Sequence, residues 1–167
     1  MIRYGTALLL CLGACAPVRP RVSLEPGARL KDYFFFVVAP VTDETGYPFS
    51  FDIADSLRER LVARLASHGL PVVPPDAPDD PAAPALVITS ALKSFKGGAI
   101  VLKLPGRGVT ACTFRSVLTD KRTGRRVGEI VASDVVEGAE GGTPFETLMG
   151  CARMVADEIH RQLRRRD

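Results

Sequence analysis

The longest run of apolar side chains behind the amino-terminal segment predicts a buried strand. Residues 33–40 read Tyr-Phe-Phe-Phe-Val-Val-Ala-Pro, and an unbroken series of aromatic and β-branched residues is typical of a strand that is buried on both faces. We therefore expect the remaining elements to pack around this strand. Pro40 ends the run, and residues 41–48 have the composition of a turn.

Two segments have the periodicity of amphipathic helices. In the first, Ser50 or Asp52 can cap the start and Gly69 stands where a helix ends in the left-handed conformation. In the second, Thr143 is placed to cap the helix, Pro144 occupies its first position, and Glu146 completes a capping box. The apolar stripes are Ile53, Leu57, Leu61 and Leu65 in the first helix and Phe145, Leu148, Ala152, Val155, Ile159 and Leu163 in the second.

The residues between the two helices predict further strands. Residues 70–73 are expected to form a short strand, and the proline-rich residues 74–81 a surface loop. Residues 85–95 are strand-like and are followed by Gly97 and Gly98, after which residues 100–104 extend the sheet or form a hairpin. The last strands, residues 109–119 and 127–136, flank a tight turn at residues 120–124, which predicts an antiparallel hairpin.

These elements predict a single α+β domain over residues 32–167. Its expected order is β-α-β-β-β-β-α, with two helices packed on one face of a mostly antiparallel sheet. A chain of 167 residues, of which 46% are hydrophobic, can supply one core of ordinary size.

The amino-terminal residues resemble the signal of a bacterial lipoprotein. Arg3 precedes the apolar residues 6–12, a run far shorter than the roughly 20 residues that span a bilayer. Leu12, Gly13, Ala14 and Cys15 then follow in the order of a lipobox.

This resemblance implies a signal peptide over residues 1–14, signal-peptidase recognition at Leu12, Gly13 and Ala14, and lipidation of Cys15 by acyl chains such as palmitate. Residues 15–31 would form the anchor and a tether without regular structure. The alternatives are an ordinary secretory leader that contains a cysteine and a buried apolar amino terminus. Ala16 follows the anchor where inner-membrane retention would favour Asp, and this pattern resembles sorting to the outer membrane.

Cys112 and Cys151 are the two cysteines that neither the leader nor the lipid would use. In an oxidising compartment they could form a disulfide. Two separate buried thiols that act as small hydrophobic residues remain an equal alternative.

Charge and motifs give no sign of nucleic-acid, metal or nucleotide binding. Removal of Arg3 with the leader leaves 21 basic against 19 acidic side chains, a balance that lacks the basic field of nucleic-acid-binding proteins. His68 and His160 have no partner at metal-ligand spacing and are expected at the surface near helix ends. Residues 106–111, Gly-Arg-Gly-Val-Thr-Ala, match a dinucleotide fingerprint, but a strand rather than a helix is expected to follow them.

No catalytic residues emerge from the sequence either. The acidic group of Asp43, Glu44, Asp52 and Asp55 is explained by capping and solvation, and no nucleophile motif is present. Residues 164–166 are three arginines at the end of the second helix, where positive charge is favourable. Contact of these arginines with anionic lipid or cell-wall polymer is the alternative.

The middle of the chain resembles a family of bacterial envelope lipoproteins, DUF4410. The likeness is carried by residues 95–108, with Lys96-Gly97-Gly98 and Gly106-Arg107-Gly108, by residues 113–118, and by the turn at 120–124. In topology the chain is also similar to the TolB amino-terminal domain, to penicillin-binding-protein activator lipoproteins and to the periplasmic part of the curli secretion lipoprotein. Unlike the curli protein, it has no alternating segments suited to membrane strands.

These relatives imply a non-enzymatic domain that docks on an envelope protein, without metal or cofactor. The sequence therefore predicts a lipoprotein on the periplasmic face of the outer membrane that acts as an interaction or accessory module. The alternative is an auxiliary lipoprotein of a lipid or envelope transport system that holds an acyl chain between helix and sheet.

Overall fold

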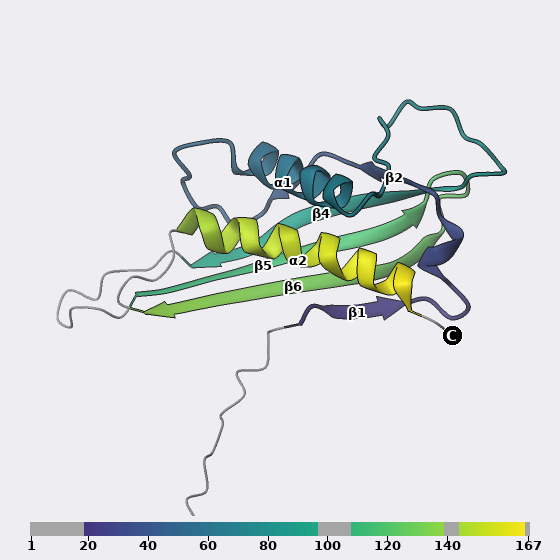
Figure 1. Ribbon diagram of the computed structural model, residues 1–167. Coiled ribbons are helices and arrows are strands. Elements are labelled where there is room, and N and C mark those ends of the chain that lie inside the picture. Colours follow the sequence, from purple (N-terminus) through teal and green to yellow (C-terminus); the bar gives the residue numbers. More distant parts are fainter. Residues whose placement is uncertain (1–18, 97–107, 139–143, 166–167) are drawn as a thin grey trace, which may run out of the picture.

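A curved sheet carries both helices on one face. The structure, a computed structural model, describes residues 19–96, 108–138 and 144–165, and Figure 1 shows both helices on the same side of the sheet. The strands are β1 (Arg21–Leu24), β2 (Phe35–Val38), β3 (Thr42–Asp43), β4 (Ala85–Lys96), β5 (Gly108–Asp120) and β6 (Arg126–Gly138). The helices are α1 (Ile53–Ser67) and α2 (Pro144–Arg164), and a short 3-10 turn spans Leu30–Asp32.

The strand order β1-β6-β5-β4-β2 confirms the predicted α+β class with a mostly antiparallel sheet. Strands β1, β6, β5 and β4 pair antiparallel, whereas β2 and β3 each pair parallel to β4. The expectation that β2 is central is wrong, because β2 ends the strand order. Its burial arises differently: Phe36 lies in the core, while Phe35 is partly buried and lines a cavity together with Pro78 of the proline-rich loop.

The predicted stripe of α1 is confirmed in full. All four of its residues are buried against the sheet. The Asp52 side chain caps the helix by accepting a hydrogen bond from the Asp55 N–H at 3.0 Å. Gly69 has φ 73°, a left-handed conformation that glycine adopts without strain.

The stripe of α2 is confirmed except at its ends. Leu148, Ala152, Val155 and Ile159 are buried, and Leu163 is partly buried at the edge of the core. Phe145 is the exception, because 46% of its surface is exposed.

The predicted hairpin of β5 and β6 is also present, and local hydrogen bonds close its turn. Asp120 accepts bonds from the backbone N–H and the hydroxyl of Thr123, each at 2.7 Å. Gly124 has φ 69° and donates its N–H to the Asp120 carbonyl at 2.9 Å.

Two segments differ from their prediction. Residues 21–24 were expected within a tether, yet they form β1 and pair with β6 from Arg21 opposite Val131 to Leu24 opposite Gly128. Residues 70–73 do not form a full strand, because only one bridge, between Phe36 and Val72, joins them to β2. Residues 15–18 lie outside the described part of the chain.

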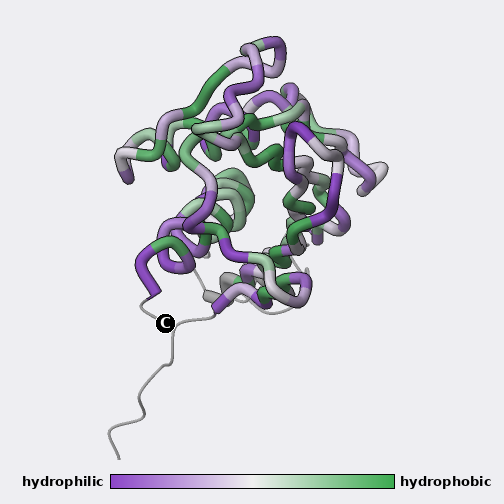
Figure 2. The backbone as a smooth tube through the Cα atoms, turned by 90° about the vertical axis from the view of Figure 1, so that its right-hand side faces the viewer, coloured by the Kyte–Doolittle hydropathy of each residue, from purple (hydrophilic) through white to green (hydrophobic). Residues whose placement is uncertain are grey.

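The core fills the space between the helices and one face of the sheet. Figure 2 shows the helices and the sheet around this space in a view turned by 90° from Figure 1. The opposite sheet face carries ion pairs, including Arg115 with Glu129 at 2.7 Å. Hydrogen bonding by Arg115 lowers the pKa of Glu129. Among the described residues, no helix is both long and apolar enough to cross a membrane.

Candidate functional site

Five aromatic side chains gather at the end of the molecule where both helices begin. We call this cluster the aromatic end; its members are Tyr47, Phe49, Phe51, Phe95 and Phe145. Ring centroids are 4.8 Å apart for Tyr47 and Phe49, 5.1 Å for Phe49 and Phe95, and 5.7 Å for Phe51 and Phe145. Tilted and edge-to-face arrangements at such distances are favourable.

An irregularity in β4 turns Phe95 toward this cluster. Leu92 pairs with Phe114, but the register then shifts, so that Phe95 pairs with Cys112. Side chains alternate between the two faces of a strand, and one extra residue reverses that alternation. Phe95 consequently shares the helix-facing side of the sheet with Leu92 and Cys112.

Hydrogen bonds within the connection from β3 to α1 position the other aromatic residues. Asp43 accepts bonds from the Thr45 backbone at 2.9 Å and the Thr45 hydroxyl at 2.7 Å, and that hydroxyl accepts the Tyr47 N–H at 3.1 Å. Glu44 pairs with Lys93 of β4. Together with the cap at Asp52, these contacts give three of the four acidic residues in this group a structural role.

The outer aromatic residues leave an apolar surface in contact with solvent. Tyr47 is 45% exposed, Phe51 42% and Phe145 46%, whereas Phe49 and Phe95 are partly buried beneath them. From the sequence, residues 41–48 were expected to form a turn and Phe145 to lie in the core, so this surface was not predicted. The alternation of Tyr47, Phe49 and Phe51 was the available signal.

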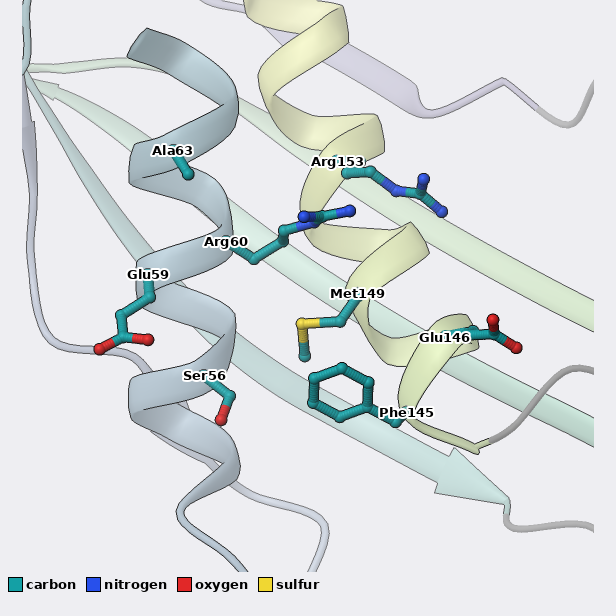
Figure 3. Close-up of a pocket in the computed structure, with 8 residues that line it drawn as sticks. All are labelled: Ser56, Glu59, Arg60, Ala63, Phe145, Glu146, Met149 and Arg153. Carbon is teal, nitrogen blue, oxygen red and sulfur yellow. The ribbon is translucent and has the colours of Figure 1, made fainter. Parts of the chain in front are cut away.

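A groove continues from the aromatic end between the two helices (Figure 3). It has a volume of about 580 Å³. Arg60 extends from α1 toward α2, while Phe145 and Met149 project from α2 into the same space. Its remaining lining residues are Ser56, Glu59, Ala63, Glu146 and Arg153. The predicted groove was between helix and sheet, whereas this groove lies between the two helices.

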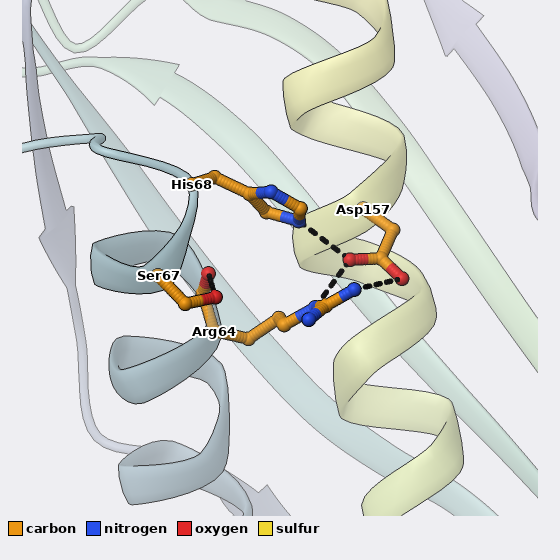
Figure 4. A network of polar contacts seen from close by, with 4 residues as sticks. All are labelled: Arg64, Ser67, His68 and Asp157. Carbon is orange, nitrogen blue, oxygen red and sulfur yellow. Dashed lines mark hydrogen bonds and ion pairs between the residues drawn. The ribbon is translucent and has the colours of Figure 1, made fainter.

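A polar network joins the far ends of the helices (Figure 4). Asp157 of α2 accepts hydrogen bonds from Arg64 Nε at 2.6 Å and from a terminal guanidinium nitrogen at 3.2 Å, and it contacts His68 Nε2 at 2.6 Å. Burial raises the pKa of Asp157, but the hydrogen bonds from Arg64 and His68 outweigh burial, so the pKa is lowered overall.

His68 and His160 contact each other, which the sequence did not indicate. Their rings stack at 4.3 Å with planes 8° apart, and both residues are partly buried rather than fully at the surface. Burial lowers the pKa of His160, and the positive potential of His68 and Arg164 lowers it further. The arrangement connects the two helices.

A disulfide between Cys112 and Cys151 joins β5 to α2. The Cα atoms are 6.9 Å apart, and both residues are buried. The structure therefore has the bonded state, one of the two alternatives that the sequence left open.

Several predicted features lie outside the described residues. These are the lipobox from Leu12 to Cys15, the glycines and sheet extension predicted over residues 97–104, Gly106 and Arg107 of the apparent nucleotide fingerprint, Thr143, and Arg166. The fingerprint's last residues belong to β5, which begins at Gly108, and no helix begins there to bind a pyrophosphate. Within the described ranges, no group of three metal-binding side chains is found.

Comparison with known proteins supports the fold. No protein-family model matches the sequence, and no curated protein matches it either, so the resemblance to DUF4410 stays a prediction. Among solved structures, a PelC dodecamer from Paraburkholderia phytofirmans is 18% identical with a TM-score of 0.57, covering 81% of this chain and 95% of that one.

Two other solved structures are similar. Protein XCC0632 from Xanthomonas campestris, of the DUF330 family, is 12% identical with a TM-score of 0.55, covering 84% of this chain and 88% of that one. Lipoprotein GNA1162 from Neisseria meningitidis is 16% identical with a TM-score of 0.50, covering 77% of this chain and 96% of that one. At these identities the likeness establishes the α+β fold alone.

Proposed function

We propose that the chain is a lipoprotein on the periplasmic face of the outer membrane, anchored through Cys15, whose non-catalytic domain docks on an envelope protein. The order Leu12-Gly13-Ala14-Cys15 behind a short apolar run carries this proposal. The buried disulfide agrees with export, because such bonds persist in oxidising compartments. One of the similar structures is named a lipoprotein, which supports association with the cell envelope.

Substitution of the anchor residue tests the location. In a Gram-negative host that expresses the full chain, wild type should incorporate labelled palmitate and sediment with outer-membrane fractions. Cys15→Ala should lose both properties, since acyl chains supply about 0.8 kcal/mol per buried methylene and no other anchor is proposed. Cys11→Ala is the matched control and should behave as wild type. If wild type and both variants all sedimented with membranes but none incorporated palmitate, the anchor at Cys15 would be wrong.

In-cell crosslinking tests the docking function. Full-length protein with a photoreactive residue in place of Glu59, at the rim of the groove, should give a discrete product that contains an envelope protein. A second copy of the chain is one such partner, because one similar structure is a dodecamer. The same residue in place of Arg122, in the turn at the other end of the sheet, is the control. If neither position gives a discrete product, the docking function is wrong.

The groove between the helices supports a second candidate, an auxiliary lipoprotein of lipid or envelope transport. Phe145 and Met149 offer apolar surface there, and Arg60 offers a positive charge, which together suit an acyl chain with an acidic head. Lipid extracted from the purified protein should then be stoichiometric by mass spectrometry, and Met149→Glu should remove it. Protein free of lipid would favour the docking module instead.

A further inference from the structure

We infer that the aromatic end rests on the membrane leaflet that holds the anchor, with Tyr47, Phe51 and Phe145 as the residues that enter the lipid interface. This inference rests on the proposed anchor at Cys15. Exposed apolar surface of this kind marks interaction sites. The tyrosine ring of Tyr47 has a polar hydroxyl and favours the boundary between lipid and water, while Phe51 and Phe145 add apolar surface of the kind that enters it.

The strand register shows in which direction the chain leaves the sheet toward its anchor. Arg21 lies in one row with Val131 of β6, Arg115 of β5 and Ala91 of β4. β6 continues from Val131 toward Asp134, which lies in the row of Phe95. Because β1 is antiparallel to β6, Arg19 and Pro20, which precede Arg21, lead toward the same end.

The remaining chain is long enough to place the anchor level with the aromatic end. Phe95 is about 10 Å from the row of Arg21 along the strands and about 14 Å across three strand spacings, or roughly 17 Å directly. Cys15 precedes Arg21 by six residues, which reach about 20 Å when extended. This segment is too short to leave the domain far from the leaflet, and the aromatic end lies within its reach.

The opposite end lacks a comparable cluster in the part that the structure describes. Phe34 is 58% exposed there, and its N–H bonds to the Pro84 carbonyl at 2.9 Å beside the start of β4. No ring contact of Phe34 is present among the described residues, whereas Phe51 and Phe145 each contact another ring. Phe34 is therefore a matched exposed aromatic residue away from the proposed contact.

Tryptophan fluorescence can test this orientation, because the chain contains no tryptophan. The Phe51→Trp, Phe145→Trp and Phe34→Trp variants would be expressed as the full chain, purified in the mature, lipidated form, and reconstituted into phosphatidylcholine vesicles with and without brominated acyl chains. Since interfacial groups sit about 5–10 Å into the headgroup and acyl boundary, we expect blue-shifted emission, reduced about twofold by bromine, for Phe51→Trp and Phe145→Trp. Emission from Phe34→Trp should be neither shifted nor quenched.

Flotation of the same vesicles distinguishes a failure of the proposed anchor at Cys15 from a failure of the proposed orientation. Vesicle-bound protein with quenching confined to Phe51→Trp and Phe145→Trp supports the inference. Vesicle-bound protein with no quenching at these positions, or with equal quenching at Phe34→Trp, overturns the orientation and leaves the anchor intact. Wild type that does not float with the vesicles overturns the anchor, and the orientation with it.

Discussion

At the scale of single residues, Gly128 is fixed by the neighbouring backbone. A Cβ atom at this position would lie 2.6 Å from the Ser23 carbonyl oxygen and 3.1 Å from the Leu24 Cα. Backbone atoms cannot yield as a flexible side chain can, so Gly128→Ala must displace β1 from β6. Overpacking of this kind costs about 1–3 kcal/mol of unfolding free energy, measurable by urea denaturation.

Gly150 provides the control for that substitution. Its added Cβ would meet a carboxylate oxygen of Asp134 at 2.5 Å, but this is the end of a side chain, and alanine favours a helix by about 1 kcal/mol over glycine. We expect Gly150→Ala to leave β1 unchanged and Gly128→Ala to speed hydrogen exchange across residues 21–24. Equal exchange in both variants would contradict the close approach.

A second residue-scale prediction concerns His160 and pH. Burial, with the nearby positive groups His68 and Arg164, lowers the pKa of His160 below its usual 6.5. The unfolded chain therefore binds the proton of this histidine more readily than the folded chain. The contribution of neutral His160 to the free energy of unfolding is fully present above pH 6.5 and is lost as the pH falls from 6.5 through the pKa of the folded state. Thermal melts between pH 7.5 and about 5 should show this loss.

His160→Gln should remove part of that dependence, because glutamine does not titrate. Asp157 titrates in a different pH range. Because its pKa is lowered overall, its contribution to the free energy of unfolding is present above pH 3.8 and is lost as the pH falls from 3.8 through the pKa of the folded state. If the melting temperatures of wild type and His160→Gln fall by the same amount across this pH range, His160 does not cause the loss of stability at low pH.

At the scale of elements, the disulfide holds α2 against β5. Cys112 and Cys151 are 39 residues apart, and closing a loop of that length in the unfolded chain is worth about 4 kcal/mol by the chain-entropy estimate. The Cys112→Ala, Cys151→Ala double variant should lose about this much stability in urea. Reductant should destabilise wild type similarly and leave the double variant unchanged; an effect on both would point to another target.

The elements that the sequence predicted well are those with local signals. The four-residue spacing of leucines in α1 and the Asp-to-Gly turn between β5 and β6 are each defined within a few consecutive residues. β1 has only four residues, and its pairing with β6 depends on contacts about a hundred positions away. Its sequence alone could not distinguish it from a tether.

The aromatic end shows the same limit for the candidate site. Phe95 reaches it only because the register of β4 shifts after Leu92, and Phe145 contacts Phe51 across 94 positions of sequence. Helical periodicity placed Phe145 on the core stripe, but its side chain projects into the groove between the helices (Figure 3), contacts Phe51 and is 46% exposed. Its exposure depends on how the two helices pack against each other, which periodicity within one helix does not report.

At the scale of the whole molecule, the proposed orientation fixes which end faces away from the membrane. The thirteen residues of β5 span about 40 Å, so the turn at residues 120–124 should lie at roughly that height when the aromatic end touches lipid. A fluorophore on Thr123→Cys should then show little energy transfer to a bilayer-bound acceptor, and one on Ser50→Cys strong transfer. Similar transfer from both positions would mean that the sheet lies flat, with β1 rather than the aromatic end against the leaflet.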